Sequence, residues 1–127
     1  MATRTTPAAC TRAAALADGE LLCADARNER VLRLGADGRE RGKFSGPFDR
    51  PSAIALDERD VAIIDGSRIH IHAPDGARRF TIGRSGSRDG EFDDPEGVLL
   101  ADRIYVSDTG NRRVQVFTRD GVFLESH

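Results

Sequence analysis

The chain has 127 residues, of which 31% are charged and 39% are apolar, and its formal net charge is −2. This length suits a single domain or a part of one, and the near-neutral charge excludes a bulk electrostatic attraction to nucleic acid or to an anionic membrane. No run approaches the ~18 apolar residues of a membrane-spanning helix, so the sequence predicts no membrane insertion.

The chain begins with a segment that carries arginines and no acid, and we interpret residues 1–12 as an N-terminal extension or an edge strand ahead of a domain of residues 13–127. Because this composition is also compatible with an organellar presequence, organellar targeting stays open. Farther on, Cys23 lies in the apolar run ELLCA, where a thiol behaves as a small buried hydrophobe. Two cysteines do not make a disulfide framework, so an intracellular, reducing compartment is favoured, although the sequence leaves the localisation unknown.

Three similar segments then follow in the chain, at residues 20–40, 60–78 and 103–123. Each has an apolar run, an aspartate, a short polar loop, an arginine, a β-rich run and an Asp-Gly pair. The aspartates are Asp25, Asp65 and Asp108, which lie 40 and 43 residues apart. The Asp-Gly pairs are typical of two-residue hairpin turns. Phe-x-x-Pro precedes the second and third units, at residues 48–51 and 92–95.

The β-favouring runs and the period of about 40 residues predict a small antiparallel sheet of four strands in each unit. Repeated sheets of this size are typical of a β-propeller, which packs its blades radially. Runs such as VAII are apolar at consecutive positions, as expected for blades that are buried on both faces by their neighbours. The sequence therefore predicts an all-β fold of about three propeller blades, with units at roughly 13–50, 51–94 and 95–127.

The third unit is similar to an NHL repeat over some forty residues. The matching residues are Gly83, Gly86, Asp89-Gly90, Phe92, Pro95, Gly97-Val98, Tyr105-Val106, Asp108, Gly110-Asn111, Arg113-Val114, Val116-Phe117 and Asp120-Gly121. The first unit is a looser match, and the middle unit has a loop shorter by two residues and lacks the asparagine. The resemblance implies blades of a typically six-bladed ring, so this chain is expected to be a partial propeller that association would complete.

The aspartate and the arginine that follows it recur in all three units, which favours a structural role over an active site. The predicted pairs are Asp25 with Arg30, Asp65 with Arg68, and Asp108 with Arg113. Each aspartate is expected to accept hydrogen bonds from loop amides and from its arginine. Asn28 and Asn111 are expected to turn the loop, because asparagine tolerates left-handed geometry. The loop side chains that remain candidates for binding a ligand are Arg27, Asn28, Asn111 and Arg112.

Other polar residues give no metal, cofactor or catalytic site in this interpretation. His70 and His72 lie on the same side of one predicted strand but have no third ligand at an evident spacing. The corresponding positions in the third unit hold Gln115 and Phe117, which favours packing between blades. The acidic residues between 89 and 96 lack the pattern of a calcium loop and are interpreted as a solvated connector.

The sequence therefore predicts a non-catalytic interaction module, which presents rim loops 26–29, 66–67 and 109–112 and the connectors between blades. Its partner is expected to be a second copy of the chain or another protein, in a homo-oligomer or a larger complex. RNA binding is the main alternative, since related NHL propellers use a basic face and aromatic residues for it. A metal-dependent propeller lyase or lactonase, formed only on dimerisation, is the less favoured one.

Overall fold

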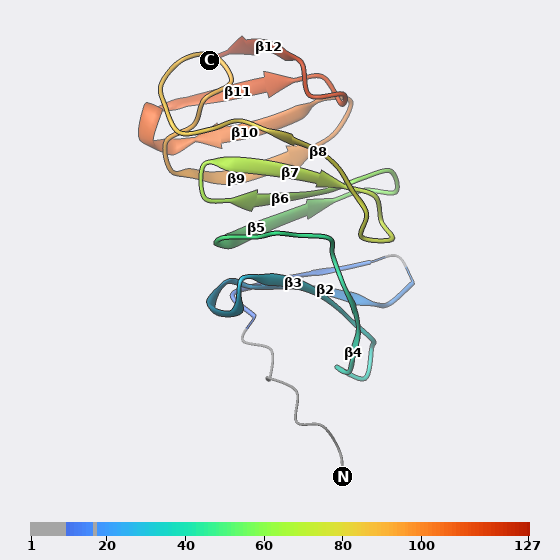
Figure 1. The fold of residues 1–127 in the computed structure, drawn as a ribbon. Coiled ribbons are helices and arrows are strands. Elements are labelled where there is room, and N and C mark those ends of the chain that lie inside the picture. The colour runs from blue at the N-terminus through green and yellow to red at the C-terminus, as the bar shows by residue number, and fades with distance from the viewer. Residues whose placement is uncertain (1–9, 17) are drawn as a thin grey trace.

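The computed structural model describes residues 10–16 and 18–127, and it contains three four-stranded antiparallel sheets that stack on one another (Figure 1). The strands are β1 (Arg12–Ala15), β2 (Leu21–Asp25), β3 (Arg30–Leu34) and β4 (Glu40–Lys43), then β5 (Pro51–Leu56), β6 (Val61–Asp65), β7 (Arg68–His72) and β8 (Arg78–Ile82), then β9 (Pro95–Leu100), β10 (Ile104–Asp108), β11 (Arg113–Phe117) and β12 (Phe123–Ser126). Single turns of 3₁₀ helix, η1 (Ala26–Asn28) and η2 (Thr109–Asn111), join β2 to β3 and β10 to β11. The predicted all-β fold of three blades is confirmed.

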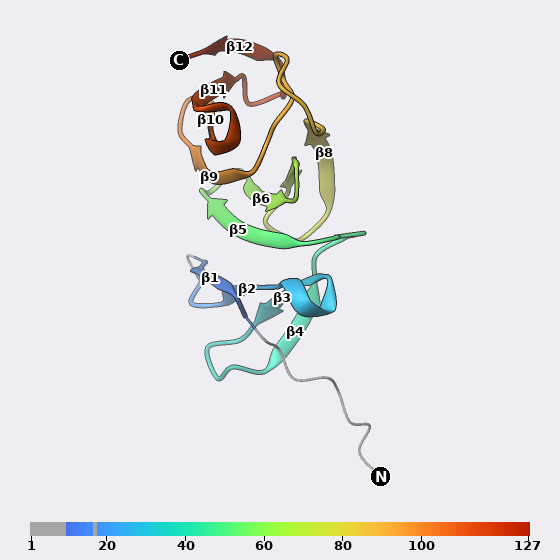
Figure 2. The same cartoon turned by 90° about the vertical axis from the view of Figure 1, so that its left-hand side faces the viewer.

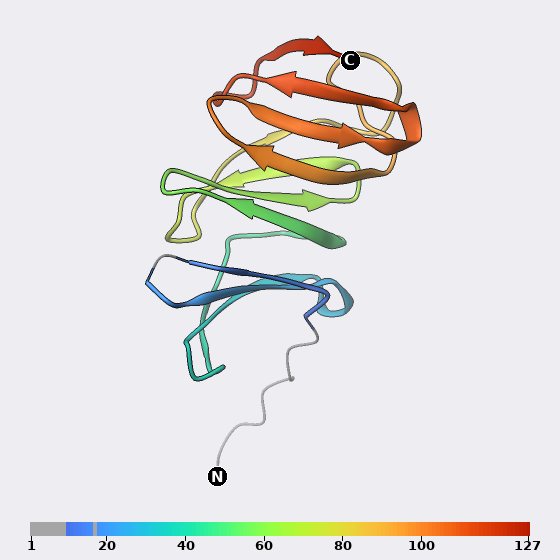
Figure 3. The ribbon, with the colours of Figure 1, turned by 180° about the vertical axis from the view of Figure 1, so that it is seen from behind.

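The strands of each blade lie in chain order, so every connection within a blade is a hairpin. The first strand of the middle blade, β5, packs beside both β1 and β9. The stack of blades is seen edge-on in Figure 2 and from behind in Figure 3. In this arrangement the first strands form the inner side of the array, and three such blades make half of a six-bladed ring.

The core consists of two apolar layers, one in each interface between blades. Ile64 and Ile71 of the middle blade pack toward the third blade, with Ile104 and Phe117. Ile63, the neighbour of Ile64 in β6, packs toward the first blade instead. Because successive side chains of a strand point to opposite faces, a blade buried on both sides needs consecutive apolar residues. This explains runs such as VAII.

The two layers differ in composition. Arg33 of β3 pairs in register with Leu22, as Ile71 of β7 pairs with Ala62, so Arg33 and Ile71 hold the same repeat position. Ile71 is fully buried, whereas Arg33 reaches the rim and lies 3.4 Å from a Glu20 carboxylate oxygen. A cavity of about 650 Å³ opens beside Arg33 between the first two blades. The interface between the first and second blades is therefore less apolar at this position than the interface between the second and third.

The Asp-Gly turns close hairpins, but with three loop residues and not the predicted two. In the β7–β8 turn, Ala73 N–H donates to the Ala77 carbonyl, and Gly76 N–H donates back to the Ala73 carbonyl. Gly76 has a φ of 102°, which suits glycine, and the following register shift is a β-bulge. The Asp75 carboxylate accepts from Ala77 N–H. A three-residue loop that ends in a left-handed glycine produces this bulged geometry.

The two cysteines form a disulfide, which corrects the expectation of a free thiol at Cys23. Cys10 and Cys23 are bonded, with their Cα atoms 5.2 Å apart. The bond links the residues just before β1 to the adjacent strand β2, so the favoured reducing compartment loses the support that a free thiol gave it. The predicted extension of residues 1–12 lies largely outside the described residues. Among the residues that the structure describes, no helix is long and apolar enough to cross a membrane.

Candidate functional site

The repeat aspartates tie the connector between blades to the loop that follows the second strand. In the third blade, Asp108 Oδ1 accepts from Asp93 N–H at 2.7 Å. Its Oδ2 accepts from the side chains of Asn111 and Arg113 at 2.9 Å and from Gln115 at 3.1 Å. Burial alone would raise the pKa of Asp108, but these hydrogen bonds outweigh it and the pKa is lowered. The carboxylate therefore stays ionised inside the blade.

The first blade repeats this arrangement. Asp25 Oδ2 accepts from Arg30 Nε and from Asn28 Nδ2, both at 2.9 Å. The left-handed residues of the two loops are Glu29 and Arg112, so the predicted left-handed asparagines are wrong. Asn28 and Asn111 shape the loops through side-chain hydrogen bonds instead.

The four binding candidates of the rim loops divide into two kinds. Asn28 and Asn111 have side-chain amides that donate to the repeat aspartates. Arg27 and Arg112 are exposed on the rim, each beside one of these asparagines. Asn28 is exposed as well, and Asn111 is half-buried, so the two amides differ from the two arginines in their bonds to the repeat aspartates and not in exposure alone.

The predicted Asp65–Arg68 pair of the middle blade is not formed. Asp65 accepts from the backbone N–H groups of Asp49 and Arg50 and from His70 Nε2, which lies 2.8 Å away. Burial opposes the ionised form of Asp65, but the hydrogen bonds of His70 and the two amides lower its pKa overall. The tight two-residue loop at 66–67 has no 3₁₀ turn. The His70 imidazole, and not the Arg68 guanidinium, is hydrogen-bonded to the Asp65 carboxylate. The Arg68 side chain is exposed and makes no hydrogen bond or ion pair among the residues that the structure describes.

His70 and His72 both pack between the first and second blades. His70 Nδ1 lies 2.8 Å from Thr81 Oγ1 and is fixed on its other side by Asp65. His72 is fully buried, stacks on Phe44 and Phe48, and lies 3.0 Å from the Gly76 carbonyl oxygen through Nδ1. Among the residues that the structure describes, no group of three or more His, Cys, Asp and Glu side chains could hold a metal ion.

Burial lowers the pKa of His72 from 6.5 to about 4. The unfolded chain takes up a proton on this imidazole at a higher pH than the folded chain does. The stability that neutral His72 contributes is therefore complete above pH 6.5 and is lost as the pH falls toward 4. We expect the free energy of unfolding to drop by roughly 2 kcal/mol from this residue between pH 7 and pH 5.

Urea denaturation of the His72→Phe variant tests this expectation. Phenylalanine is the residue at this repeat position in the third blade, Phe117, and it does not titrate. The variant should lose most of the pH dependence between pH 7 and pH 5. His127→Phe, at an exposed position, is the control and should keep it. Equal slopes for His72→Phe and the unmodified chain would contradict the assignment.

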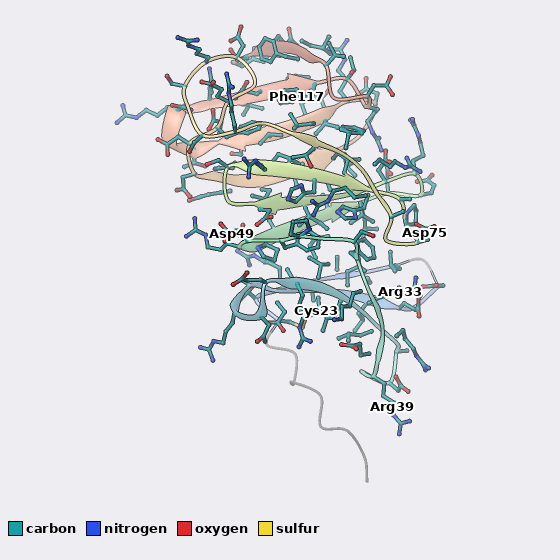
Figure 4. All side chains as sticks on the ribbon, in the orientation of Figure 1. Cys23, Arg33, Arg39, Asp49, Asp75 and Phe117 are labelled. Atoms are coloured by element: carbon teal, nitrogen blue, oxygen red, sulfur yellow. A yellow bond between two sulfur atoms is a disulfide. The ribbon has the colours of Figure 1, made fainter. Side chains whose placement is uncertain are left out.

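A cleft of about 470 Å³ opens on the rim between the first and second blades. Its lining includes Phe48, Arg68, His70, Arg78 and Thr81. Asp49, which is labelled on this rim in Figure 4, also lines it. Arg78 lies over the Phe48 ring and donates to the Pro47 carbonyl at 2.8 Å, so one side of the cleft is fixed. Arg68 and Thr81 are exposed polar groups of the cleft.

The opposite rim carries a network of ion pairs that the sequence does not predict. Arg119, in the β11–β12 turn, donates to Asp57 at 2.9 Å and to Asp60 at 2.8 Å. Asp60 also pairs with Arg79. Since Asp57 and Asp60 lie in the β5–β6 turn, the network joins the second blade to the third. Arg119 lies two positions after the β-rich run that ends at Phe117, and no pattern marks it as a partner of residues some sixty positions earlier.

The stacked four-stranded sheets and their inner first strands define the class of the molecule, which is a partial β-propeller. A streptogramin B lyase structure superposes on this chain with a TM-score of 0.70 and 17% sequence identity. The superposition covers 89% of this chain and 38% of the lyase chain. A catalytically inactive virginiamycin B lyase from Staphylococcus aureus with quinupristin gives 0.66 and 17% identity, over 88% of this chain and 39% of its own. At these identities, the likeness shows the fold alone.

The sequence comparison identifies the type of repeat. The human NHL repeat-containing protein 3 is 32% identical over 100 residues, which are 71% of this chain and 28% of that protein. No protein-family model matches the chain. The relative, together with the propeller fold, identifies the chain as an NHL-like β-propeller array. It spans less than a third of the length of that relative.

Proposed function

We propose that the chain is an assembly module, which joins a second copy through the outer faces of its end blades to complete a six-bladed ring. The observation that carries the proposal is the outer face of the third blade, where Leu99 is 60% exposed, Leu124 42% and Val114 38%. Exposed apolar surface of this kind is typical of interaction sites. The resemblance to NHL-repeat proteins, which often mediate interactions, supports the same function.

The repeat explains why a second copy fits this face. Val114 pairs in register with Ser107, as Ile69 pairs with Ile64, so Val114 holds the position of Ile69. Ile69 is fully buried against the third blade. The outer face of the third blade thus corresponds to the face that the middle blade turns toward a neighbour.

The outer face of the first blade supplies the matching surface. Leu21 pairs with Leu34 in the register in which Ile104 pairs with Phe117. Ile104 and Phe117 are the residues that the third blade packs against the middle one. A second copy would therefore place Leu21 and Leu34 against the exposed leucines of the third blade, as the internal interfaces do.

Native mass spectrometry and sedimentation test this association. We expect a species of twice 13.8 kDa in the unmodified chain. Leu99→Glu should shift it to the monomer, because a carboxylate in this interface would be desolvated without a partner. Val122→Glu is the matched control, since Val122 is also 60% exposed but lies in the β11–β12 turn. A monomer at all concentrations, or a dimer unchanged by Leu99→Glu, would contradict the proposal.

A further inference from the structure

The third blade shows how a peptide segment can bind beside a repeat aspartate. Arg113 Nη2 donates to the backbone carbonyls of Arg88 at 2.7 Å and Glu91 at 3.0 Å. Gln115 Nε2 donates to the Glu91 carbonyl at 2.6 Å, and Gly90 N–H donates to Gln115 Oε1 at 2.8 Å. The segment 88–91 of the connector is therefore held through its backbone by one arginine and one amide side chain.

The middle blade has the same positions but lacks the contact between the arginine and the connector. Arg68 pairs in register with Asp65 as Arg113 pairs with Asp108, and His70 holds the position of Gln115. The connector before the middle blade has seven residues, 44–50, whereas the one before the third blade has twelve, 83–94. Counted back from Phe-x-x-Pro, residues 44–47 correspond to segment 88–91, but none of their carbonyls accepts from Arg68. The Pro47 carbonyl, at the position of Glu91, accepts from Arg78 instead. The cleft of about 470 Å³ lies there, between the connector and the β7–β8 pair.

The polar groups of this cleft suit a peptide better than a simple anion. The side-chain N–H groups of Arg68 donate to no described residue. The Thr81 hydroxyl is exposed and lies 2.8 Å from His70 Nδ1. Glu29 and Asp49 line the same cleft, so their carboxylates offset the charge of Arg68. A neutral peptide backbone offers carbonyl acceptors to a guanidinium without a net charge that these carboxylates would repel.

We infer that the cleft binds a short turn of a partner polypeptide, whose backbone carbonyls accept hydrogen bonds from Arg68 as segment 88–91 does from Arg113. In both blades an arginine would donate to the bound backbone. The second polar group would differ, because His70 and Thr81 stand in the middle blade where Gln115 stands in the third. The cleft lies on the rim and the faces used for assembly lie at the ends of the array. The inference therefore goes beyond the proposed assembly and concerns a second, separate surface.

A peptide with the sequence of residues 84–91, RSGSRDGE, capped at both ends, is a direct probe. It would be titrated into the full chain and followed by fluorescence anisotropy and by NMR shifts of the Thr81 and Arg68 amides. We expect saturable binding, weakened at least about ten-fold in Arg68→Ala, because two charge-assisted hydrogen bonds are lost. Arg68→Lys should fall between the two, since an ammonium lacks the planar fork of arginine. Arg103→Ala, at an exposed position of the β9–β10 turn that does not line the cleft, should bind as the unmodified chain does.

Three results would overturn the inference. They are the absence of saturable binding, equal weakening by Arg103→Ala and Arg68→Ala, and displacement of the peptide by an equal concentration of inorganic phosphate, which would assign Arg68 to an anion. The Leu99→Glu variant separates this test from that of assembly. It should bind the peptide normally even as a monomer. Loss of peptide binding in Arg68→Ala, with the native mass of that variant unchanged, would leave the assembly proposal intact.

Discussion

Replacing Asp108 with asparagine is expected to lower the free energy of unfolding by about 3–5 kcal/mol, the cost of breaking a buried, fully bonded charge network. Asp108 is fully buried, and one of its oxygens accepts from three side chains, those of Asn111, Arg113 and Gln115. An asparagine can offer one oxygen only, so either these donors or the Asp93 amide must face its NH₂ group. The guanidinium of Arg113 would also lose its countercharge.

Chemical denaturation of Asp108→Asn and Asp102→Asn would measure this cost. Asp102 is an exposed aspartate of the β9–β10 turn, and it accepts a hydrogen bond from the Tyr105 hydroxyl at 3.4 Å. The Asp102 variant should change stability by less than about 0.5 kcal/mol, as is usual for surface positions. Losses of similar size in both variants would show that the repeat aspartate does not organise the connector.

Replacing Arg119 with methionine is the second substitution with a large expected effect. Methionine keeps the apolar stem but removes the cation that lies between Asp57 and Asp60. Asp60 is almost fully buried, and of the cations that the structure describes its carboxylate would keep Arg79. Removing one partner of a buried ion network costs about 3–5 kcal/mol, and the exposure of Asp57 places this case near 3 kcal/mol.

Denaturation of Arg119→Met and Arg103→Met at several pH values tests this network. The hydrogen bond from Arg119 lowers the pKa of Asp57 from 3.8 to about 2. The stability from this pair is therefore complete above pH 3.8 and is lost as the pH falls toward 2. Arg119→Met should lose this dependence and be less stable at neutral pH. Arg103 pairs with Glu125 at 3.8 Å on the surface, so its variant should be nearly neutral. An Arg119 variant as stable as the Arg103 variant would contradict the role of the network.

The blade architecture is predictable because its signals recur. A run of consecutive apolar residues, an aspartate and an Asp-Gly turn appear three times, so each unit supports the interpretation of the others. The aspartate in the first and third units lies within five residues of its arginine, and such local contacts follow from the repeat itself. The same regularity led to the wrong pairing in the middle unit. Alignment preserves the positions of Asp65 and Arg68, but a tight two-residue loop and a nearby histidine change which groups meet.

The features that the sequence did not reveal depend on contacts between distant segments. Arg119 and Asp57 are 62 positions apart, and no periodic pattern relates them. The cleft beside Arg68 depends on how the connector 44–50 packs against β7 and β8, which no sequence pattern specifies. Cys10 and Cys23 are close in the chain, but their pairing depends on the register of β1 against β2.

The unequal composition of the two layers between blades bears on how the array finds its correct order. Identical repeats can slip by one unit, so that the first blade docks on the third and the middle one is left out. Here such a slip would bring Arg33 against the partners of Ile71 and would bury a guanidinium in an aliphatic layer. The cost of burying this charge disfavours the shifted arrangement. A single charged side chain therefore helps to determine the order in which the blades pack.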